Sequence, residues 1–368
     1  MTSPAGEGGG ITADELRAMQ AADYVLLERG GELERVPVRK TRLPLDPVGH
    51  VQRLNFTAAP DGTLYAAQHS LWHRSADGGE SWTHLERPSP GEGWRLQFAP
   101  DGSMVNVGPG PEGRPAVWSS GDEGESWRRI GGLDAGGEGA RLDLGFSVTR
   151  LPCGALLVPL LVVEGEGEED ASAGSRTCHM YRSDDGGRSW ERAGTIGEWC
   201  HEVNLTVLPD GRLLAVIRYQ RPRLPEDPEE LLQEAGHPEW PYKHVFLSHS
   251  GDEGATWEPP RQLCTVYGQC YGAAGVRPDN TVAVVHDHRY PRSLGSGRAR
   301  VSRDGGDTFG GEVYYLVHGY AAGYAATLSP DGESFLTLTG SCYADVDSGW
   351  NAAIGTTRFV LIRWRPVD

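Results

Sequence analysis

The chain of 368 residues contains no run of about 20 consecutive apolar residues, the length that an α-helix needs to cross a bilayer. It begins without the basic segment and apolar core that are typical of a secretory signal peptide. Lysine and arginine number only 34 against 51 acidic residues, so the formal charge is −17. Nucleic-acid binding requires a surplus of cationic side chains. We therefore expect a cytoplasmic protein that has no membrane or nucleic-acid partner.

Cysteine is also sparse, and its six positions show no CxxC spacing. Their scatter argues against a disulfide framework and a cysteine zinc site, and it favours free, mostly buried thiols. His286 and His288 flank Asp287 and would lie on one face of a strand, but no third ligand accompanies them. We interpret these histidines as structural, and we expect neither a metal nor a cofactor.

Leucine-rich helical periodicity is scarce, whereas 51 glycines and 25 prolines indicate frequent turns. Residues 1–20 are expected to form a poorly ordered tail with one helical turn. Residues 21–368 are expected to form a single domain of short strands.

One octet with the pattern S-x-D-x-G-x-x-W/F recurs five times along the chain. Its copies are SADGGESW (75–82), SGDEGESW (120–127), SDDGGRSW (183–190), SGDEGATW (250–257) and SRDGGDTF (302–309). The pattern predicts a β-hairpin turn in which the aspartate accepts backbone N–H groups, the glycine takes a positive φ and the aromatic ring packs beneath. Five copies in order predict a repeat architecture.

A second repeated signal is an apolar run, a tight turn and another apolar run. The six turns are Asp61-Gly62, Asp101-Gly102, Cys153-Gly154, Asp210-Gly211, Asp279-Asn280 and Asp331-Gly332. Six hairpins with five octets predict four-stranded sheets around an axis, an all-β fold with six propeller blades. The final sheet ends at FVLIRWRP (359–366), and we expect the strand at 24–38 to complete it and close the ring.

The octets resemble Asp boxes, and five of them on a six-bladed frame resemble the sialidase (neuraminidase) superfamily over residues 24–366. Asp boxes also occur in polysaccharide lyases, other glycosidases and propellers that are not enzymes. The resemblance therefore implies the fold, and the function must be inferred from the site.

In such a blade, the innermost strand starts near the axis at one face of the propeller, and the second strand returns to that same face. Glu202 and Arg218 lie eight residues before and after Asp210 in HEVNLTVLPDGRLLAVIR (201–218), so both should face a central funnel. Arg53 lies eight residues before its turn, and Tyr324 lies seven before. We expect these four side chains to share one site.

The resemblance implies a role for each residue of that site. Tyr324 resembles the sialidase nucleophile, Glu202 the glutamate that activates it, and Arg53 and Arg218 two of three arginines that bind the substrate carboxylate. The third arginine is Arg298 by strand parity, with Arg289 next and Arg292 as a further candidate. Three guanidinium groups suit the carboxylate of sialic acid. A neutral tyrosine avoids the repulsion that a carboxylate nucleophile would meet.

The acid/base aspartate of sialidases has no counterpart in AAQHSLWHRSADGG (66–79), where His69 is the titratable group nearest the right place. Asp287 and the acidic insertion at 164–174 are the other candidates. The insertion at 221–244 follows Arg218 and has two interpretations: a lid that carries Trp240 and Tyr242 as sugar-stacking platforms, or a passive insertion.

The sequence thus predicts a retaining exo-glycoside hydrolase that removes a terminal acidic sugar, such as sialic acid, from a glycan. Two alternatives remain open. One is a lyase or hydrolase of uronic-acid polymers that uses His69 and Tyr324, and the other is a glycan-binding propeller without catalysis.

Overall fold

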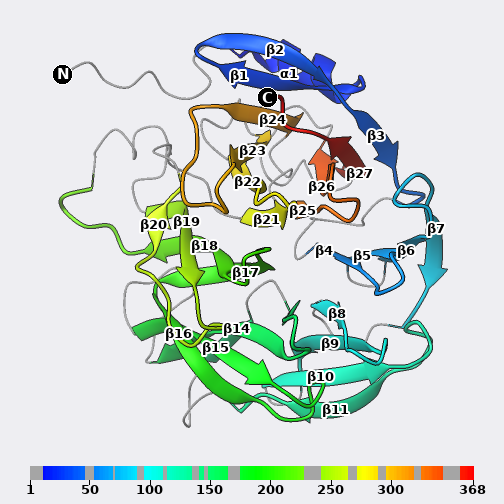
Figure 1. Cartoon of the computed structure of the whole chain (residues 1–368), viewed down its shortest axis with the longest axis vertical. Helices are drawn as coiled ribbons and strands as arrows, with labels where there is room; N and C mark the ends of the chain where they lie inside the picture. Colours follow the sequence, from blue (N-terminus) through cyan, green and yellow to red (C-terminus); the bar gives the residue numbers. More distant parts are fainter. Residues whose placement is uncertain are drawn as a thin grey trace.

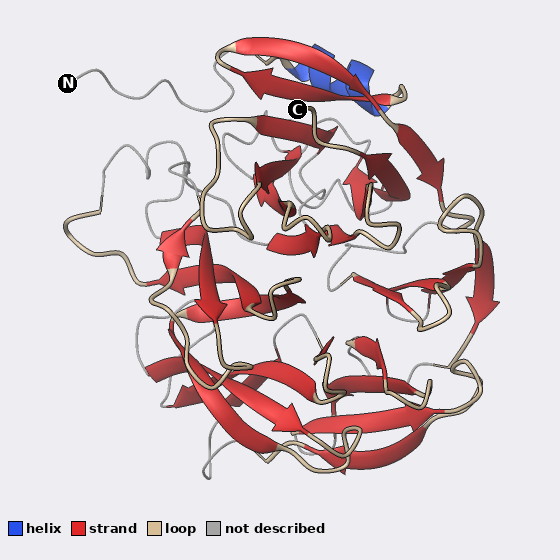
Figure 2. Cartoon of the chain, viewed as in Figure 1, coloured by secondary structure: helices blue, strands red, loops and turns tan. Residues whose placement is uncertain are grey.

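Each apolar run with its tight turn forms an antiparallel hairpin, and the computed structural model assembles these hairpins into six sheets around one axis (Figures 1 and 2). The structure describes residues 11–45, 54–68, 71–88, 95–110, 114–134, 141–144, 148–164, 175–227, 242–263, 272–288, 296–318, 325–342 and 357–368. Over these residues the predicted six-bladed β-propeller is confirmed.

Within each blade, the strands follow one another outwards from the axis. Blade one holds β4 (Asn55–Ala58), β5 (Leu64–Gln68), β6 (Leu71–Ser75) and β7 (Thr83–Glu86). Blade two holds β8 (Leu96–Phe98), β9 (Met104–Pro109), β10 (Pro115–Ser120) and β11 (Arg128–Gly132). Blade three holds β12 (Arg141–Leu144) and β13 (Thr149–Arg150), both paired with β14 (Leu156–Glu164), then β15 (Ser175–Ser183) and β16 (Glu191–Glu198).

The second half of the ring follows the same order. Blade four holds β17 (Cys200–Val207), β18 (Leu213–Arg221), β19 (Tyr242–Ser250) and β20 (Arg261–Gln262). Blade five holds β21 (Gly272–Val276), β22 (Val282–His288), β23 (Ser296–Ser302) and β24 (Val313–His318). Blade six holds β25 (Ala325–Leu328), β26 (Phe335–Cys342), β27 (Thr357–Trp364) and β3 (Arg39–Arg42).

Ring closure differs from the prediction that the strand at 24–38 completes blade six. The residues 24–37 form a hairpin, β1 (Tyr24–Arg29) and β2 (Glu32–Pro37), and β1 pairs with β24 at the outer edge of blade five. The next strand, β3, pairs with β27 and closes the ring. Blade five therefore has two additional strands, because Val25 and Leu27 are buried there in the core that β24 covers.

The helix α1 (Ala13–Gln20) occupies part of the segment expected to be a tail. A capping box between Thr12 and Glu15 starts it, and the fully buried Leu16 and Met19 pack into the core of blade five. Lys40 of β3 donates to the carbonyl groups of Met19 (2.5 Å), Ala22 (2.7 Å) and Tyr24 (2.9 Å), which fixes the end of the helix. No described helix has the length and apolarity to span a membrane.

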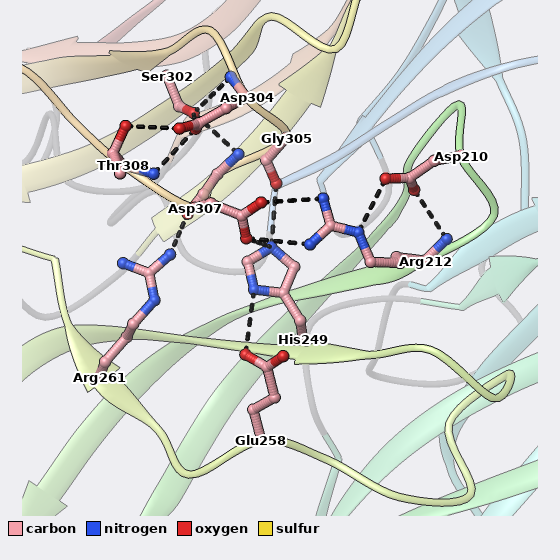
Figure 3. A network of polar contacts seen from close by, with 11 residues as sticks. Asp210, Arg212, His249, Glu258, Arg261, Ser302, Asp304, Gly305, Asp307 and Thr308 are labelled. Carbon is pink, nitrogen blue, oxygen red and sulfur yellow. Dashed lines mark hydrogen bonds and ion pairs between the residues drawn. The ribbon is translucent and has the colours of Figure 1, made fainter.

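The octets form the hydrogen-bonded turns that their sequence predicts. In the fifth octet, Ser302 donates to Asp304 (2.6 Å), which also accepts the N–H (2.9 Å) and hydroxyl (2.5 Å) of Thr308 (Figure 3). The glycine at the fifth position of this octet, Gly306, has a φ of +91°. The indole N–H of Trp190 closes the third octet by donating to Gly187 (3.0 Å).

Neighbouring blades are joined at the octets by arginine side chains. Arg212 of blade four donates to Asp210 (2.8 Å) and reaches Asp307 of the fifth octet with both terminal nitrogens, at 3.0 and 3.2 Å (Figure 3). Arg182 of blade three binds Glu253 of the fourth octet at 2.6 Å in the same way. An octet therefore links the strand that precedes it to the adjoining blade.

Strand β18 shows why its sequence is a continuous apolar run. Leu213 and Ile217 pack in the core shared with blade three, whereas Leu214 and Val216 pack in the core shared with blade five. A propeller sheet is buried on both faces, so alternation of apolar and polar residues is absent.

An axial cavity of about 260 Å³ lies between the innermost strands. Polar side chains that line it donate across blade boundaries to backbone carbonyl groups, as Thr206 does to Ala274 (2.7 Å) and Gln97 to Val148 (3.1 Å). These bonds satisfy the carbonyl groups at the inner sheet edges, where no further strand can pair.

Candidate active site

The propeller has two distinct ends. The octets and the tight turns lie at one end, which we call the octet end. At the other end, which we call the site end, the innermost strands begin and the second strands finish. Glu202 near the start of β17 and Arg218 near the finish of β18 are both at the site end.

Glu202 and Arg218 form an ion pair in which the Arg218 Nη1 and Glu202 Oε2 atoms are 2.8 Å apart. The two side chains are only 15% and 17% exposed, so the pair is largely removed from water. The Arg218 Nη2 atom donates to the side-chain oxygen of Gln220. These partners hold the guanidinium in one orientation.

The position of Glu202 depends on an irregular backbone. A single residue, Trp199, separates the outermost strand of blade three from the innermost strand of blade four. Trp199 has a φ of +62° and Glu202 a φ of +43°, a region that non-glycine residues seldom occupy. The register between β17 and β18 also shifts between His201 and Asn204. The bulge turns Glu202 out of the regular alternation, and backbone strain of this kind concentrates at functional sites.

His201 is the strand partner of Arg218 and is 7% exposed. Burial, followed by the positive charges of Arg218, Arg176 and Lys243, lowers the pKa of His201 to about 3. The imidazole is therefore neutral at physiological pH and adds no charge beside the ion pair.

Blade five places a second group of buried polar residues at the site end. Asp287 lies eight residues after the turn residue Asp279, the position that Arg218 has in blade four, and it is 1% exposed. Burial lowers the pKa of its neighbour His286 to about 4, and the His286 Nδ1 atom is 3.0 Å from the Asp287 carbonyl oxygen. Nδ1 therefore donates, and His286 is neutral.

Arg298 is also buried, with 1% exposure, and is the strand partner of His286. Its guanidinium lies over the ring of Tyr315, with 4.7 Å from Cζ to the ring centroid. The Tyr315 hydroxyl donates to Glu28 at 2.5 Å, which extends this stack to the N-terminal hairpin. Arg298 thus has the burial of a core residue, and its assignment as third arginine stays a prediction.

Tyr242 occupies the start of β19, and its ring is partly covered. The Arg221 Cζ atom is 4.0 Å from the Tyr242 ring centroid, and the ring of His244 is 4.7 Å away. The predicted role of Tyr242 as a sugar platform is untested, and this packing leaves less of the ring to a ligand. Five further candidates, together with Arg292, lie outside the described residues: Arg53, His69, Trp240, Arg289 and Tyr324. The acidic insertion lies there too, from residue 165 onwards.

Several polar residues that are buried at the site end were not predicted from the sequence. Asn55, Arg95 and Asn204 each lie six residues before the aspartate of their turn, and their exposures are 9%, 1% and 9%. Arg176, which is 3% exposed, lies at the start of a third strand. Positions six residues before each turn aspartate include the first three residues. The prediction used positions seven or eight residues from each turn on the first two strands of a blade, and these positions include none of the four.

The described residues contain no group of three or more histidine, cysteine, aspartate or glutamate side chains that could hold a metal ion. The chemistry available in this part of the chain is that of a carboxylate beside a guanidinium. Such a pair can accept a proton and can bind an anionic group.

No protein-family model and no curated protein sequence matches the chain. Solved structures do match it. A protein of unknown function from Dyadobacter fermentans has a TM-score of 0.60 at 16% identity, covering 90% of this chain and 99% of its own. The α-L-arabinofuranosidase Arb93A of Fusarium graminearum, solved with an iminosugar inhibitor, has a TM-score of 0.58 at 12% identity, covering 88% and 96%.

The Hadza microbial sialidase Hz136 has a TM-score of 0.57 at 13% identity. The match covers 85% of this chain and 65% of the sialidase, so the chain spans about two thirds of that protein. Identities this low show the fold alone. In fold, this protein is therefore a six-bladed β-propeller similar to the structures of Arb93A and the sialidase Hz136.

Proposed function

We propose that the protein is a retaining exo-glycoside hydrolase of the sialidase type, which removes a terminal acidic sugar from a glycan. The observation that supports this proposal most strongly is the Glu202–Arg218 pair at 2.8 Å, largely buried at the site end. Isolated buried charges are costly, so a purely structural role would favour apolar residues at these positions. A site that binds an anion and moves a proton requires both groups.

Arg218 is the proposed anchor for the substrate carboxylate. Glu202 and Gln220 hold its guanidinium, and His201 is neutral, so it does not compete with Arg218 for a carboxylate. A carboxylate that binds a preoriented guanidinium gains short, charge-assisted hydrogen bonds. Arg53, with Arg298 or Arg289, would complete the clamp.

Glu202 is the proposed base for the nucleophile Tyr324. The phenolic oxygen would attack the anomeric carbon while its proton passes to Glu202, and the bond to the leaving oxygen would break. An acid, His69 or Asp287, would protonate that oxygen. Water would then attack the anomeric carbon and give a proton to the conjugate base of that acid, while the departing Tyr324 phenolate takes back the proton held by Glu202, so that atoms and charges balance over the cycle.

A panel of 4-methylumbelliferyl glycosides tests the proposal, with the sialic acid derivative first and glucuronic acid next. A fluorinated sialic acid should leave a covalent adduct on Tyr324, detected by peptide mass spectrometry. Turnover of the uronide alone would favour the uronic-acid alternative. Binding of acidic sugars without turnover would favour the binding propeller.

A second candidate is a hydrolase of neutral sugars that uses two carboxylates. Glu202, which pairs with Arg218, is the first carboxylate. The buried Asp287 is the second, and it occupies in blade five the position that Arg218 has in blade four. The arabinofuranosidase Arb93A matches this chain over nearly its whole length. Cleavage of an aryl α-L-arabinofuranoside, with loss of activity in Asp287→Asn and no effect of Tyr324→Phe, would favour this candidate.

A further inference from the structure

A pocket of about 540 Å³ opens at the junction of blades three and four, separate from the Glu202–Arg218 pair. Its described walls include Glu198, Trp199, Tyr219, Arg221, Leu224 and Phe246. Tyr219 and Phe246 pack on the core shared with blade three, so the alternation of β18 directs Arg218 to the opposite face. The pocket and the candidate active site thus use opposite faces of the same strands.

The pocket walls are fixed before any ligand binds. The rings of Tyr219 and Phe246 stack with centroids 4.4 Å apart. Trp199 is held at its positive φ by two backbone bonds, from its N–H to Arg176 (2.8 Å) and from the N–H of Gln220 to its carbonyl (3.0 Å). Prearranged walls lower the entropy cost of binding.

The positive charge of Arg221 is balanced by a nearby carboxylate, that of Asp227. Its two terminal nitrogens bind the Asp227 carboxylate at 2.7 and 2.8 Å, and its guanidinium lies over the Tyr242 ring. The Asp227 side chain is 6% exposed, so this pair is well shielded from water. Among the described wall residues, the other charged side chain is that of Glu198, which is exposed. The pocket therefore offers aromatic surfaces and a negative rim.

We propose that this pocket is a second carbohydrate site, which binds a neutral sugar ring. Pockets of this size, lined mainly by apolar and aromatic residues with a few polar groups, are typical of small-ligand sites. The C–H face of a sugar ring packs on the rings of Trp199 and Tyr219, while its hydroxyl groups donate to the Glu198 carboxylate. An acidic sugar is repelled by Glu198 and finds Arg221 already paired. The proposal does not depend on turnover at Glu202.

Titration calorimetry of the intact protein tests the site with neutral disaccharides, namely lactose, cellobiose, chitobiose and arabinobiose. N-acetylneuraminic acid and glucuronic acid serve as acidic probes. At least one neutral disaccharide should bind, and Trp199→Ala should weaken its binding at least tenfold. Trp199→Phe is the matched control, because it keeps an aromatic ring on the same backbone and should retain most of the affinity. Arg218→Ala should leave the neutral sugar bound and should affect acidic probes alone.

A charge reversal at Glu198 gives a second test. Because Glu198 is exposed, its replacement should not disturb the core. Glu198→Lys should weaken the neutral sugar severalfold and strengthen binding of glucuronic acid. The proposal is overturned if no neutral disaccharide binds, or if Arg218→Ala abolishes neutral binding while Trp199→Ala does not. Equal affinity of the Arg218→Ala protein for acidic and neutral probes would also overturn it. A protein without glycosidase activity that still binds lactose through Trp199 would reject the proposed function and keep this site.

Discussion

At the octet end, the aspartates lie near the surface and accept hydrogen bonds from residues within the same eight-residue segment, as Asp304 does from Ser302 and Thr308. At the site end, His201, Asp287 and others are almost fully buried, and the groups around them come from different strands. Surface aspartates in local turns cost little desolvation, whereas buried titratable groups cost much more. The difference supports a structural role for the octet end and is consistent with the proposal that the site end carries the function.

The largest expected effect follows from replacing the carboxylate of the buried ion pair. Glu202→Gln should lower turnover by on the order of 10²–10⁴-fold, because the amide cannot accept the nucleophile's proton. The matched control is Glu253→Gln at the octet end, where the carboxylate pairs with Arg182 at 2.6 Å. Turnover of both variants is measured on the best substrate of the glycoside panel.

The control variant should keep full activity and a similar melting temperature. Equal losses in both variants would contradict the functional difference between the two ends. Full activity of Glu202→Gln would reject its assignment as a base.

The two ends should lose stability in different pH ranges. The folded-state pKa is lowered from 6.5 to about 3 for His201 and to about 4 for His286, by burial first. The stability from these histidines is complete above pH 6.5 and is lost as the pH falls towards 3–4. Hydrogen bonds from Ser126 and Ser120 lower the pKa of Asp122 from 3.8 to about 2, so its contribution is lost only below about pH 3.8.

Urea denaturation at pH values from 8 to 2.5 separates these ranges. The unfolding free energy should first fall with a slope that approaches two protons, then fall again in the acid range. His201→Gln combined with His286→Gln should flatten the first decline alone, and Asp122→Asn the second alone. A single decline, unchanged in the histidine variant, would be inconsistent with neutral buried histidines.

Removing the central carboxylate of one octet should destabilise the fold without altering the site. Asp304→Ala removes the acceptor for Ser302 and for both donors of Thr308. Loss of these bonds should lower the free energy of unfolding by about 1–3 kcal/mol. Chemical denaturation measures this change, and Asp304→Asn, which keeps one acceptor, should lose less. Reduced turnover in the folded Asp304→Ala protein would show that the ends are coupled.

The smallest effect is expected for the link between blades four and five. Arg212→Gln breaks the contacts with Asp307, whose side chain is 48% exposed (Figure 3). A partly exposed pair contributes about 0.5–1 kcal/mol, and added salt should reduce the difference from the unaltered protein. Arg212→Lys keeps the charge but loses the bidentate geometry, so its free energy of unfolding should lie between those of the unaltered protein and Arg212→Gln. A loss above about 3 kcal/mol would mean that the blade interface depends on this arginine, as a buried pair would.

The fold was predictable because its signals are local and repeated. Each octet and each tight turn specifies its own hairpin, through an aspartate acceptor and a positive-φ residue such as Gly211. The positions eight residues from Asp210 also placed Glu202 and Arg218 at the same end of blade four. The burial of Arg95 was missed, because the prediction used positions eight residues from each turn, whereas Arg95 lies six residues before Asp101.

The sequence by itself determined the number of blades, their order and the end at which Glu202 and Arg218 lie, since these follow from local turn chemistry and strand alternation. Only the tertiary structure decided that β1 and β2 extend blade five while β3 closes the ring. A strand near the N-terminus could pair with the outer edge of blade five or of blade six, and core packing selects between these two edges. The tertiary structure also decided the direct contact of Glu202 with Arg218 and the neutral state of His201. Both depend on the bulge at Glu202 and on burial among groups that are distant in the sequence, such as Arg176.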